Sequence, residues 1–200
     1  MDVIYIIFAY LLGSVPTAYI YFRIKQNKDI RNYGSGNSGA LNIWRSQNIS
    51  SGALVLIIDL IKAISIALTG KNIEISEVGF YIGTVCSVLG HNYPVYLKFK
   101  GGKGVSVVAG ITLVIITIPS FIAGITIGII GLITKSPLWG ILMGALVLNG
   151  LTLIIEQSIS LSIWCAVISL IVGVTHFSRR KEELITAIKN MDLNKIGKIE

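Results

Sequence analysis

Two glycine-rich segments with basic residues beside them are the parts of this 200-residue chain best suited to hold phosphate groups. The first glycine loop runs from Gly34 to Gly39, and the second glycine loop runs from Lys100 to Gly104. Glycine lets backbone N–H groups approach an anion closely, and lysine or arginine adds positive charge. Together the two loops predict a site for phosphorylated molecules.

The second glycine loop is not a Walker A loop, because Gly104 stands where a serine or threonine would have to bind magnesium. Glycines around Lys103, just before an apolar helix, still form a suitable nest for an isolated phosphate group. The predicted phosphate-binding residues of this loop are Lys100, Gly101, Gly102, Lys103 and Gly104.

The spacing of Gly34, Gly36 and Gly39 matches a dinucleotide-binding fingerprint, but that motif requires a preceding strand and a crossover helix. What remains is a segment rich in amides and hydroxyls, with Arg45 nearby to clamp an anion through its forked guanidinium. A solvated basic loop is the equally weighted alternative. The candidate site residues here are Ser35, Gly36, Asn37, Asn42 and Arg45.

Both histidines, His91 and His176, follow apolar segments. A neutral histidine there could accept a proton or donate a hydrogen bond to a phosphate oxygen. An isolated histidine at a membrane interface is as often structural, so both interpretations stand.

Composition predicts an all-α, polytopic transmembrane bundle that forms a single domain. The chain is 53% hydrophobic and 14% charged, with a mean hydropathy of +0.76, and apolar runs of about 20 residues recur. Ile118-Pro119-Ser120 divides a run too long for one span. About seven spans are expected, with six as the alternative, and the first is retained rather than cleaved. They cover residues 3–22, 53–69, 78–97, 105–117, 120–134, 138–155 and 159–175, and a tail covers residues 176–200.

The net charge of +7 has a simpler explanation than nucleic-acid binding. With seven spans, every lysine and arginine except Lys62 and Lys71 falls on one side of the membrane. The positive-inside rule then places the N-terminus outside and the C-terminus in the cytoplasm. Asp59 and Lys62, three residues apart in the second span, share a helix face and are expected to form a structural pair more than a functional one.

Cys86 and Cys165 lie in apolar runs and are expected to be reduced packing residues. Neither shows metal-ligand spacing, and no metal or cofactor is expected. A monomer is compatible with all of these features.

The order of these elements resembles the bacterial acyl-phosphate:glycerol-3-phosphate acyltransferases, integral membrane enzymes of phospholipid synthesis. The resemblance spans essentially the whole chain. It is carried by Gly13 to Tyr19, by Gly34 to Ala40 with Asn42 and Arg45, and by Gly90 to Val95 with Phe99 to Val105.

The resemblance implies transfer of a fatty acyl group from acyl phosphate to the 1-hydroxyl of glycerol 3-phosphate, giving lysophosphatidic acid and phosphate. It implies an active site on the cytoplasmic side of the bacterial cytoplasmic membrane. It also implies that the Ser35 to Arg45 motif and the Lys103 loop line the site, and that His176 completes it. Membrane lipid and the two substrates are the implied partners.

The chain departs from the family pattern mainly in its third motif. Arg179 stands where an asparagine is usual, and Asn190 to Asp192 replace a Gly-Thr-Glu element. Arg179 could still bind phosphate, but it lacks the acceptor of an amide. Leu41 replaces a usual threonine, and Ala63 a usual glycine.

Two other functions remain as alternatives. One is a non-enzymatic carrier or binding protein for a phosphorylated molecule, although the chain shows no internal repeat of the kind carriers use. The other is an enzyme with a different acceptor. The H-x4-D signature of acyl-CoA-dependent acyltransferases is absent, because Tyr96 and Lys181 stand five residues after the histidines.

Overall fold

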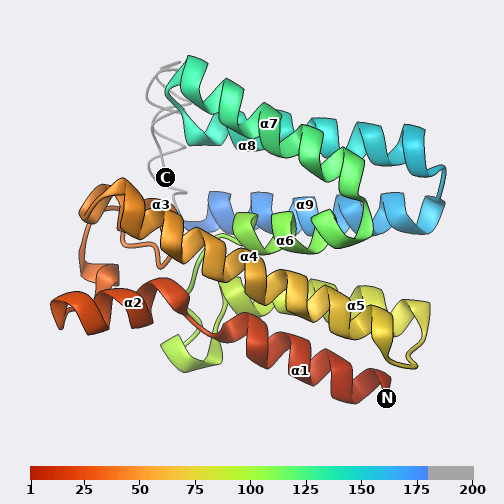
Figure 1. The fold of residues 1–200 in the computed structure, drawn as a ribbon, viewed down its shortest axis with the longest axis horizontal. Coiled ribbons are helices and arrows are strands. Elements are labelled where there is room, and N and C mark those ends of the chain that lie inside the picture. Colours follow the sequence, from red (N-terminus) through yellow and green to blue (C-terminus); the bar gives the residue numbers. More distant parts are fainter. Residues whose placement is uncertain (180–200) are drawn as a thin grey trace. The chain divides into compact units, whose positions relative to one another are not determined.

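The computed structural model describes residues 1–179, and all regular structure in that range is helical (Figure 1). Here η1 and η2 are 3-10 helices and η3 is a π-helical turn. The elements are α1 (Asp2–Ser14), α2 (Thr17–Gln26), η1 (Ile30–Asn32), α3 (Ala40–Ser46), α4 (Ile49–Asn72), α5 (Glu77–Asn92), η2 (Val95–Leu97), α6 (Val105–Ile115), α7 (Thr117–Thr134), α8 (Pro137–Leu151), η3 (Thr152–Glu156) and α9 (Ile159–Arg179).

The predicted all-helical membrane architecture is confirmed. Within the described range, five segments are long and apolar enough to cross a membrane: Asp2–Gln26, Ile49–Asn72, Thr117–Thr134, Pro137–Glu156 and Ile159–Arg179. The apolar helix α6 has only 11 residues and α5 has 16. The number of seven spans and the side of each terminus therefore stay predictions.

The first predicted span contains an interruption that the prediction lacked. Helix α1 ends at Ser14 and α2 begins at Thr17, with Pro16 between them. Proline has no N–H to donate, and it disfavours helical geometry in the residue before it. The break leaves backbone carbonyls of α1 without helical partners, which matters for the site described below.

Two further boundaries differ from prediction, both beside prolines. Helix α5 ends at Asn92 rather than 97, because Pro94 disfavours helical geometry at Tyr93. The predicted division of residues 105–134 exists, but it lies at Ile116, where φ is −134°. Pro119 instead occupies the first turn of α7, where a missing N–H costs no helical hydrogen bond.

The last two predicted spans also differ in detail. The segment after α8 adopts a π-helical turn, and α9 continues past Thr175 to Arg179. His176 and Arg179 thus belong to the last described turn of α9. The predicted motif Asn190 to Asp192 lies outside the described residues.

The chain divides into two units, Met1–Ile115 and the part from Ile116 onward. In the first unit α1 packs against α5, and α4 packs against α6. In the second unit α7 packs along α8. A buried cluster in the first unit joins α2, η1, α3 and α4, and so fixes both ends of the first glycine loop. It consists of Ala18, Phe22, Ile30, Ile43 and Val55.

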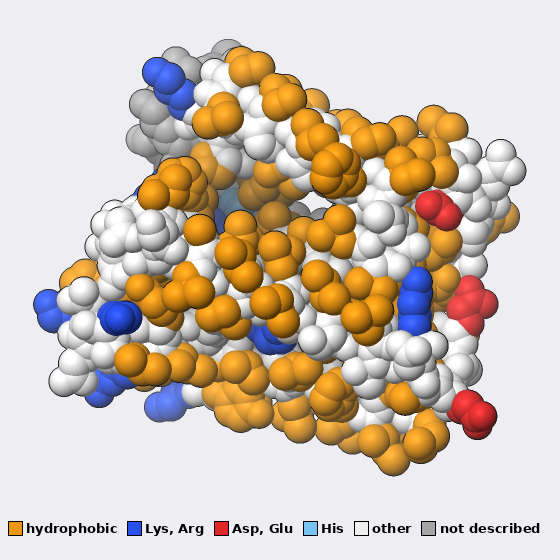
Figure 2. All heavy atoms as spheres, in the orientation of Figure 1, with side chains coloured by type: hydrophobic (Ala, Val, Ile, Leu, Met, Phe, Trp, Pro, Cys, Tyr) orange, Lys and Arg blue, Asp and Glu red, His pale blue; other side chains and the backbone are white. Residues whose placement is uncertain are grey.

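Apolar side chains cover most of the face shown in Figure 2, as expected of helices that contact lipid. Within the first unit, basic side chains gather at the end that holds α2 and α3. Acidic side chains lie toward the other end, near the N-terminus. The end that holds α2 and α3 is therefore the more basic end of this unit.

Candidate active site

The first glycine loop is held by the buried side chain of Asn42, which is 1% exposed. Its Nδ2 donates to the carbonyl oxygens of Tyr33 at 2.9 Å and Asn37 at 2.8 Å. Its Oδ1 accepts a hydrogen bond from the backbone N–H of Ser35 at 3.0 Å. Asn42, predicted from sequence as a substrate-binding residue, therefore uses its amide to shape the loop.

Left-handed backbone gives the first glycine loop its turns. Gly34 has φ +57° and Gly36 has φ +70°, a region that glycine enters without steric cost. Between them Ser35 is half-buried, while Arg45 is exposed on α3. Loop and helix thus present a hydroxyl and a guanidinium from the same short segment.

Two buried polar atoms of this loop have no hydrogen-bond partner among the described residues. They are the Oδ1 of Asn37 and the Oγ of Ser38, whose side chain is 4% exposed. An unsatisfied buried polar group costs about 1–3 kcal/mol. A ligand that supplied partners would remove this cost. Asn37 was predicted as a site residue, whereas Ser38 was missed.

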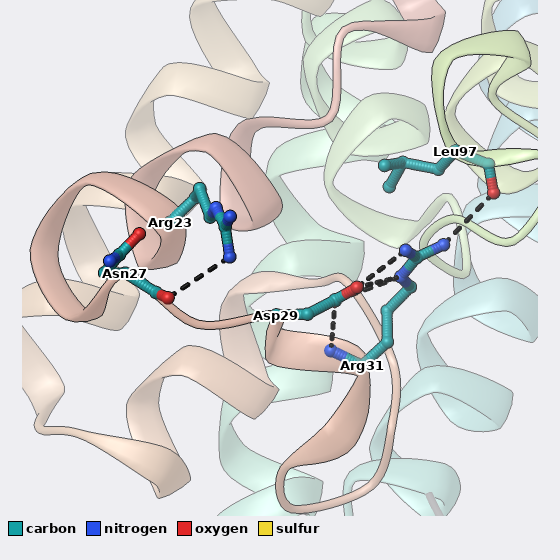
Figure 3. A network of polar contacts seen from close by, with 5 residues as sticks. All are labelled: Arg23, Asn27, Asp29, Arg31 and Leu97. Atoms are coloured by element: carbon teal, nitrogen blue, oxygen red, sulfur yellow. Dashed lines mark hydrogen bonds and ion pairs between the residues drawn. The ribbon is translucent and has the colours of Figure 1, made fainter.

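Arg31 joins the two loop regions of the first unit (Figure 3). Its Nη2 lies 2.6 Å from Asp29 Oδ2, and its Nη1 donates to the carbonyl oxygen of Leu97 at 3.2 Å. The Arg31 side chain, by donating to the carboxylate, holds the pKa of Asp29 below its ordinary value. The same ion pair raises the pKa of Arg31. Sequence reasoning missed this link, because η1 and η2 are far apart in the chain.

The second glycine loop packs directly against the end of α5. The N–H of Gly101 donates to the carbonyl of Asn92 at 3.1 Å, and that of Gly102 donates to His91 at 2.9 Å. A Cβ atom on Gly102 would overlap Nε2 of the His91 ring. These two glycines permit a close approach, and their amides are used inside the protein rather than offered to an anion.

The lysines in this loop and just before it have different environments. Lys103 is 9% exposed, whereas Lys98 and Lys100 are exposed. Lys103 is followed by Gly104, whose backbone turns with a φ of +85° just before α6 begins at Val105. A buried ammonium at the N-terminus of a helix is well placed to bind an anion.

Behind this loop lies a buried polar cluster centred on Asp59, which is 1% exposed. The predicted pair with Lys62 is confirmed, with Nζ 3.1 Å from Oδ1 of Asp59. Lys62 also donates to the carbonyl oxygens of Gly13 at 3.2 Å and Val15 at 2.9 Å, which the break at Pro16 leaves without helical partners. The pair thus stabilises the interruption between α1 and α2.

The remaining predicted site residues, His176 and Arg179, lie in the second unit. His176 is 7% exposed in the last turn of α9, and Arg179 is half-buried in the same turn. Three residues apart on a helix, they lie on one face. Residues 1–179 contain no group of three or more histidine, cysteine or acidic side chains that could hold a metal ion. Cys86 and Cys165 are both free, as predicted.

Comparison with known proteins agrees with the family resemblance noted in the sequence. A family model described as glycerol-3-phosphate acyltransferase matches residues 3–186. A glycerol-3-phosphate acyltransferase of Thermoanaerobacter sp. (strain X514) is 34% identical over 179 residues, which is 89% of each chain. This chain belongs to the glycerol-3-phosphate acyltransferase family.

Solved structures of the family share the fold. PlsY (YgiH), an integral membrane glycerol 3-phosphate acyltransferase, superposes in its glycerol 3-phosphate form with a TM-score of 0.83 at 27% identity. That match covers 96% of this chain and 98% of the other. Its lysophosphatidic acid form gives a TM-score of 0.76 at 25% identity, over 94% and 92% of the two chains.

Proposed function

We propose that this member of the glycerol-3-phosphate acyltransferase family transfers a fatty acyl group from acyl phosphate to the 1-hydroxyl of glycerol 3-phosphate. The products are lysophosphatidic acid and inorganic phosphate. Family membership carries this proposal, and the PlsY structures with glycerol 3-phosphate and with lysophosphatidic acid support its acceptor and product.

The reaction forms one ester bond and breaks one anhydride bond. The hydroxyl oxygen of glycerol 3-phosphate attacks the acyl carbonyl carbon, and the bond from that carbon to the phosphate oxygen breaks. The hydroxyl proton passes to the departing phosphate, to His91 or to His176. An acyl phosphate is already activated, so the protein needs mainly to position the substrates and neutralise charge, and the leaving phosphate is the acceptor we favour.

The two loops supply the groups that this chemistry needs. Lys103 and Arg45 are proposed to offset the phosphate charges, with Arg179 and Lys100 as further cations at the site. Ser35, Gly36 and Asn37 are proposed to contact glycerol 3-phosphate. Asn42 and the second-loop glycines are proposed to hold this arrangement, in line with their internal hydrogen bonds.

The proposed location is the bacterial cytoplasmic membrane, with seven spans in a single domain and the active site on the cytoplasmic side. The charge asymmetry of the first unit supports this orientation, because its basic end holds α2, α3 and the first glycine loop (Figure 2). The acyl tail can then stay in the bilayer while its head reaches the loops.

The deciding experiment measures lysophosphatidic acid formed by purified protein from glycerol 3-phosphate, with palmitoyl phosphate or palmitoyl-CoA as donor. Product from palmitoyl phosphate alone is expected. Product from palmitoyl-CoA alone would overturn the proposed donor. Binding of glycerol 3-phosphate without product, by a folded protein, would favour the carrier or binding-protein alternative.

A matched pair of lysine variants tests the phosphate site. Lys103→Ala should lower kcat/KM by roughly 100-fold or more, since it removes a charge that acts on the reacting phosphates. Lys98→Asn removes an exposed lysine of the same segment and should leave activity unchanged. Asparagine is chosen because Lys98 has φ +53°, which asparagine tolerates. Equal activity in the two variants would contradict the proposed role of Lys103.

A further inference from the structure

One buried carboxylate contacts three other helices of the first unit. Asp59 of α4 accepts a hydrogen bond at Oδ1 from Oγ1 of Thr17, the first residue of α2, at 2.8 Å. At its other oxygen it accepts one from Oγ of Ser106 in α6 at 3.4 Å. Its Oδ1 also lies 4.0 Å from Nδ1 of His91 in α5. Three helices are therefore tied to one side chain of α4.

Neutralisation by Lys62 accounts for only part of this arrangement. Burying an ion pair costs desolvation that the attraction between the charges barely offsets. The hydrogen bonds from Lys62 to the carbonyl oxygens of Gly13 and Val15 explain why a cation lies beside the break at Pro16. They do not explain why Asp59 also reaches Ser106 and faces His91.

The His91 ring lies between Asp59 and the second glycine loop. Its Nδ1 edge faces the carboxylate, and its Nε2 edge lies against Gly102, the residue before Lys103. A carboxylate on one side of an imidazole favours a proton on the nearer nitrogen and orients the ring. Ser106 lies on the other side of Lys103, in the first turn of α6. Asp59 thus contacts residues that precede and follow Lys103 in the sequence.

We propose that Asp59 is a positioning residue for the acyl transfer, acting through the His91 ring, with Ser106 holding the second oxygen of its carboxylate. This inference rests on the proposed function. It assigns the intramembrane carboxylate a role in turnover, beyond the structural pairing with Lys62.

The test is a double-mutant cycle on the purified full-length protein, assayed with palmitoyl phosphate and glycerol 3-phosphate. Asp59→Asn keeps the size of the side chain and removes its charge. It should lower kcat about tenfold or more, with a smaller change in KM for glycerol 3-phosphate.

In a His91→Ala background the same substitution should lower kcat by less than about twofold, because residues that act as a unit are not additive. Ser65→Ala, on the exposed side of α4, is the matched control and should change neither parameter.

Folding is checked by melting temperature and gel filtration in detergent. If Asp59→Asn does not fold, Ser106→Ala takes its place, since it leaves the pair with Lys62 intact. It should lower kcat in the wild-type background and not in His91→Ala.

An equal loss in both backgrounds would overturn the inference and leave Asp59 as a stabiliser of helix packing. Full activity of His91→Ala would also overturn it, while the proposed function would stand. Absence of product from the folded wild-type protein would instead overturn the proposed function.

Discussion

The guanidinium of Arg31 donates a hydrogen bond to the carbonyl oxygen of Leu97, and it is thereby held between two segments 66 residues apart (Figure 3). The same side chain also lies 5.4 Å from the centre of the Tyr19 ring. Asp29 fixes the orientation of this side chain by accepting hydrogen bonds from its Nε and Nη2. One residue of η1 therefore connects α2, the approach to the first glycine loop and the approach to the second.

Replacing Arg31 by lysine should lower kcat/KM by roughly tenfold, because a lysine cannot bond Asp29 through a fork and reach Leu97 together. Steady-state kinetics with palmitoyl phosphate and glycerol 3-phosphate measure the effect. Arg23→Lys is the control, since Arg23 is exposed and bonds only to Asn27 near the end of its own helix (Figure 3). An equal loss in both variants would mean that general surface charge, rather than the link to Leu97, matters.

Asp29 gives this link a dependence on pH. The hydrogen bonds from the Arg31 side chain lower the pKa of Asp29 below its ordinary value of 3.8. Because the folded-state pKa is depressed, the pair adds stability above the ordinary value, and this is lost as pH falls through the depressed value. Asp29→Asn should therefore melt at a lower temperature than wild type at pH 7, by an amount equivalent to under about 1 kcal/mol. The gap should close below about pH 4. A gap independent of pH would show that the charge of Asp29 is not involved.

Asn42→Ala should lower the free energy of unfolding by about 2–3 kcal/mol, because it leaves buried groups of the first glycine loop without partners. Thermal unfolding measures this loss, and activity should fall with it. The control is Asn72→Ala, since Asn72 is exposed and donates only to Leu68 in its own helix. Unchanged stability with lost activity would assign Asn42 to substrate binding instead.

Much of this arrangement could be predicted from local sequence. The glycine and basic residues of both loops were enough to predict a candidate site, which stays a prediction, and the spacing of Asp59 and Lys62 was enough to predict their pairing. Pro16 and Pro94 carried the signal for the breaks after Ser14 and Asn92, because the effect of proline on the preceding residue is local. The predicted spans 3–22 and 78–97 ran unbroken past these prolines and were wrong there.

The rest depended on contacts between distant segments. No pattern near Gly102 shows that its amide caps α5 or that it lies against His91, so close packing and phosphate binding could not be told apart. The same holds for Ser106 and Asp59, which belong to different helices. Such contacts follow from how the helices pack, which periodicity alone does not specify.

Ser38→Ala should raise KM for glycerol 3-phosphate by about threefold to tenfold, the equivalent of one hydrogen bond. The buried hydroxyl of Ser38 has no partner in the described part of the chain, so a substrate hydroxyl or phosphate oxygen is the group we expect it to meet. Melting temperature without substrate should not fall, because the variant removes an unsatisfied group. Ser50→Ala, at an exposed position, provides the comparison. An unchanged KM would place Ser38 outside the substrate contacts.

Arg179→Asn restores the residue usual in the family three positions after the last histidine, and it should raise kcat with glycerol 3-phosphate. His176 and Arg179 share the last turn of α9, so an amide there would supply an acceptor that a guanidinium lacks. Arg179 is only half-buried, so the exchange should leave the protein folded. Kinetics of the two proteins at saturating palmitoyl phosphate make the comparison. A lower kcat with a raised KM for glycerol 3-phosphate would show that Arg179 has itself become a phosphate ligand in this chain.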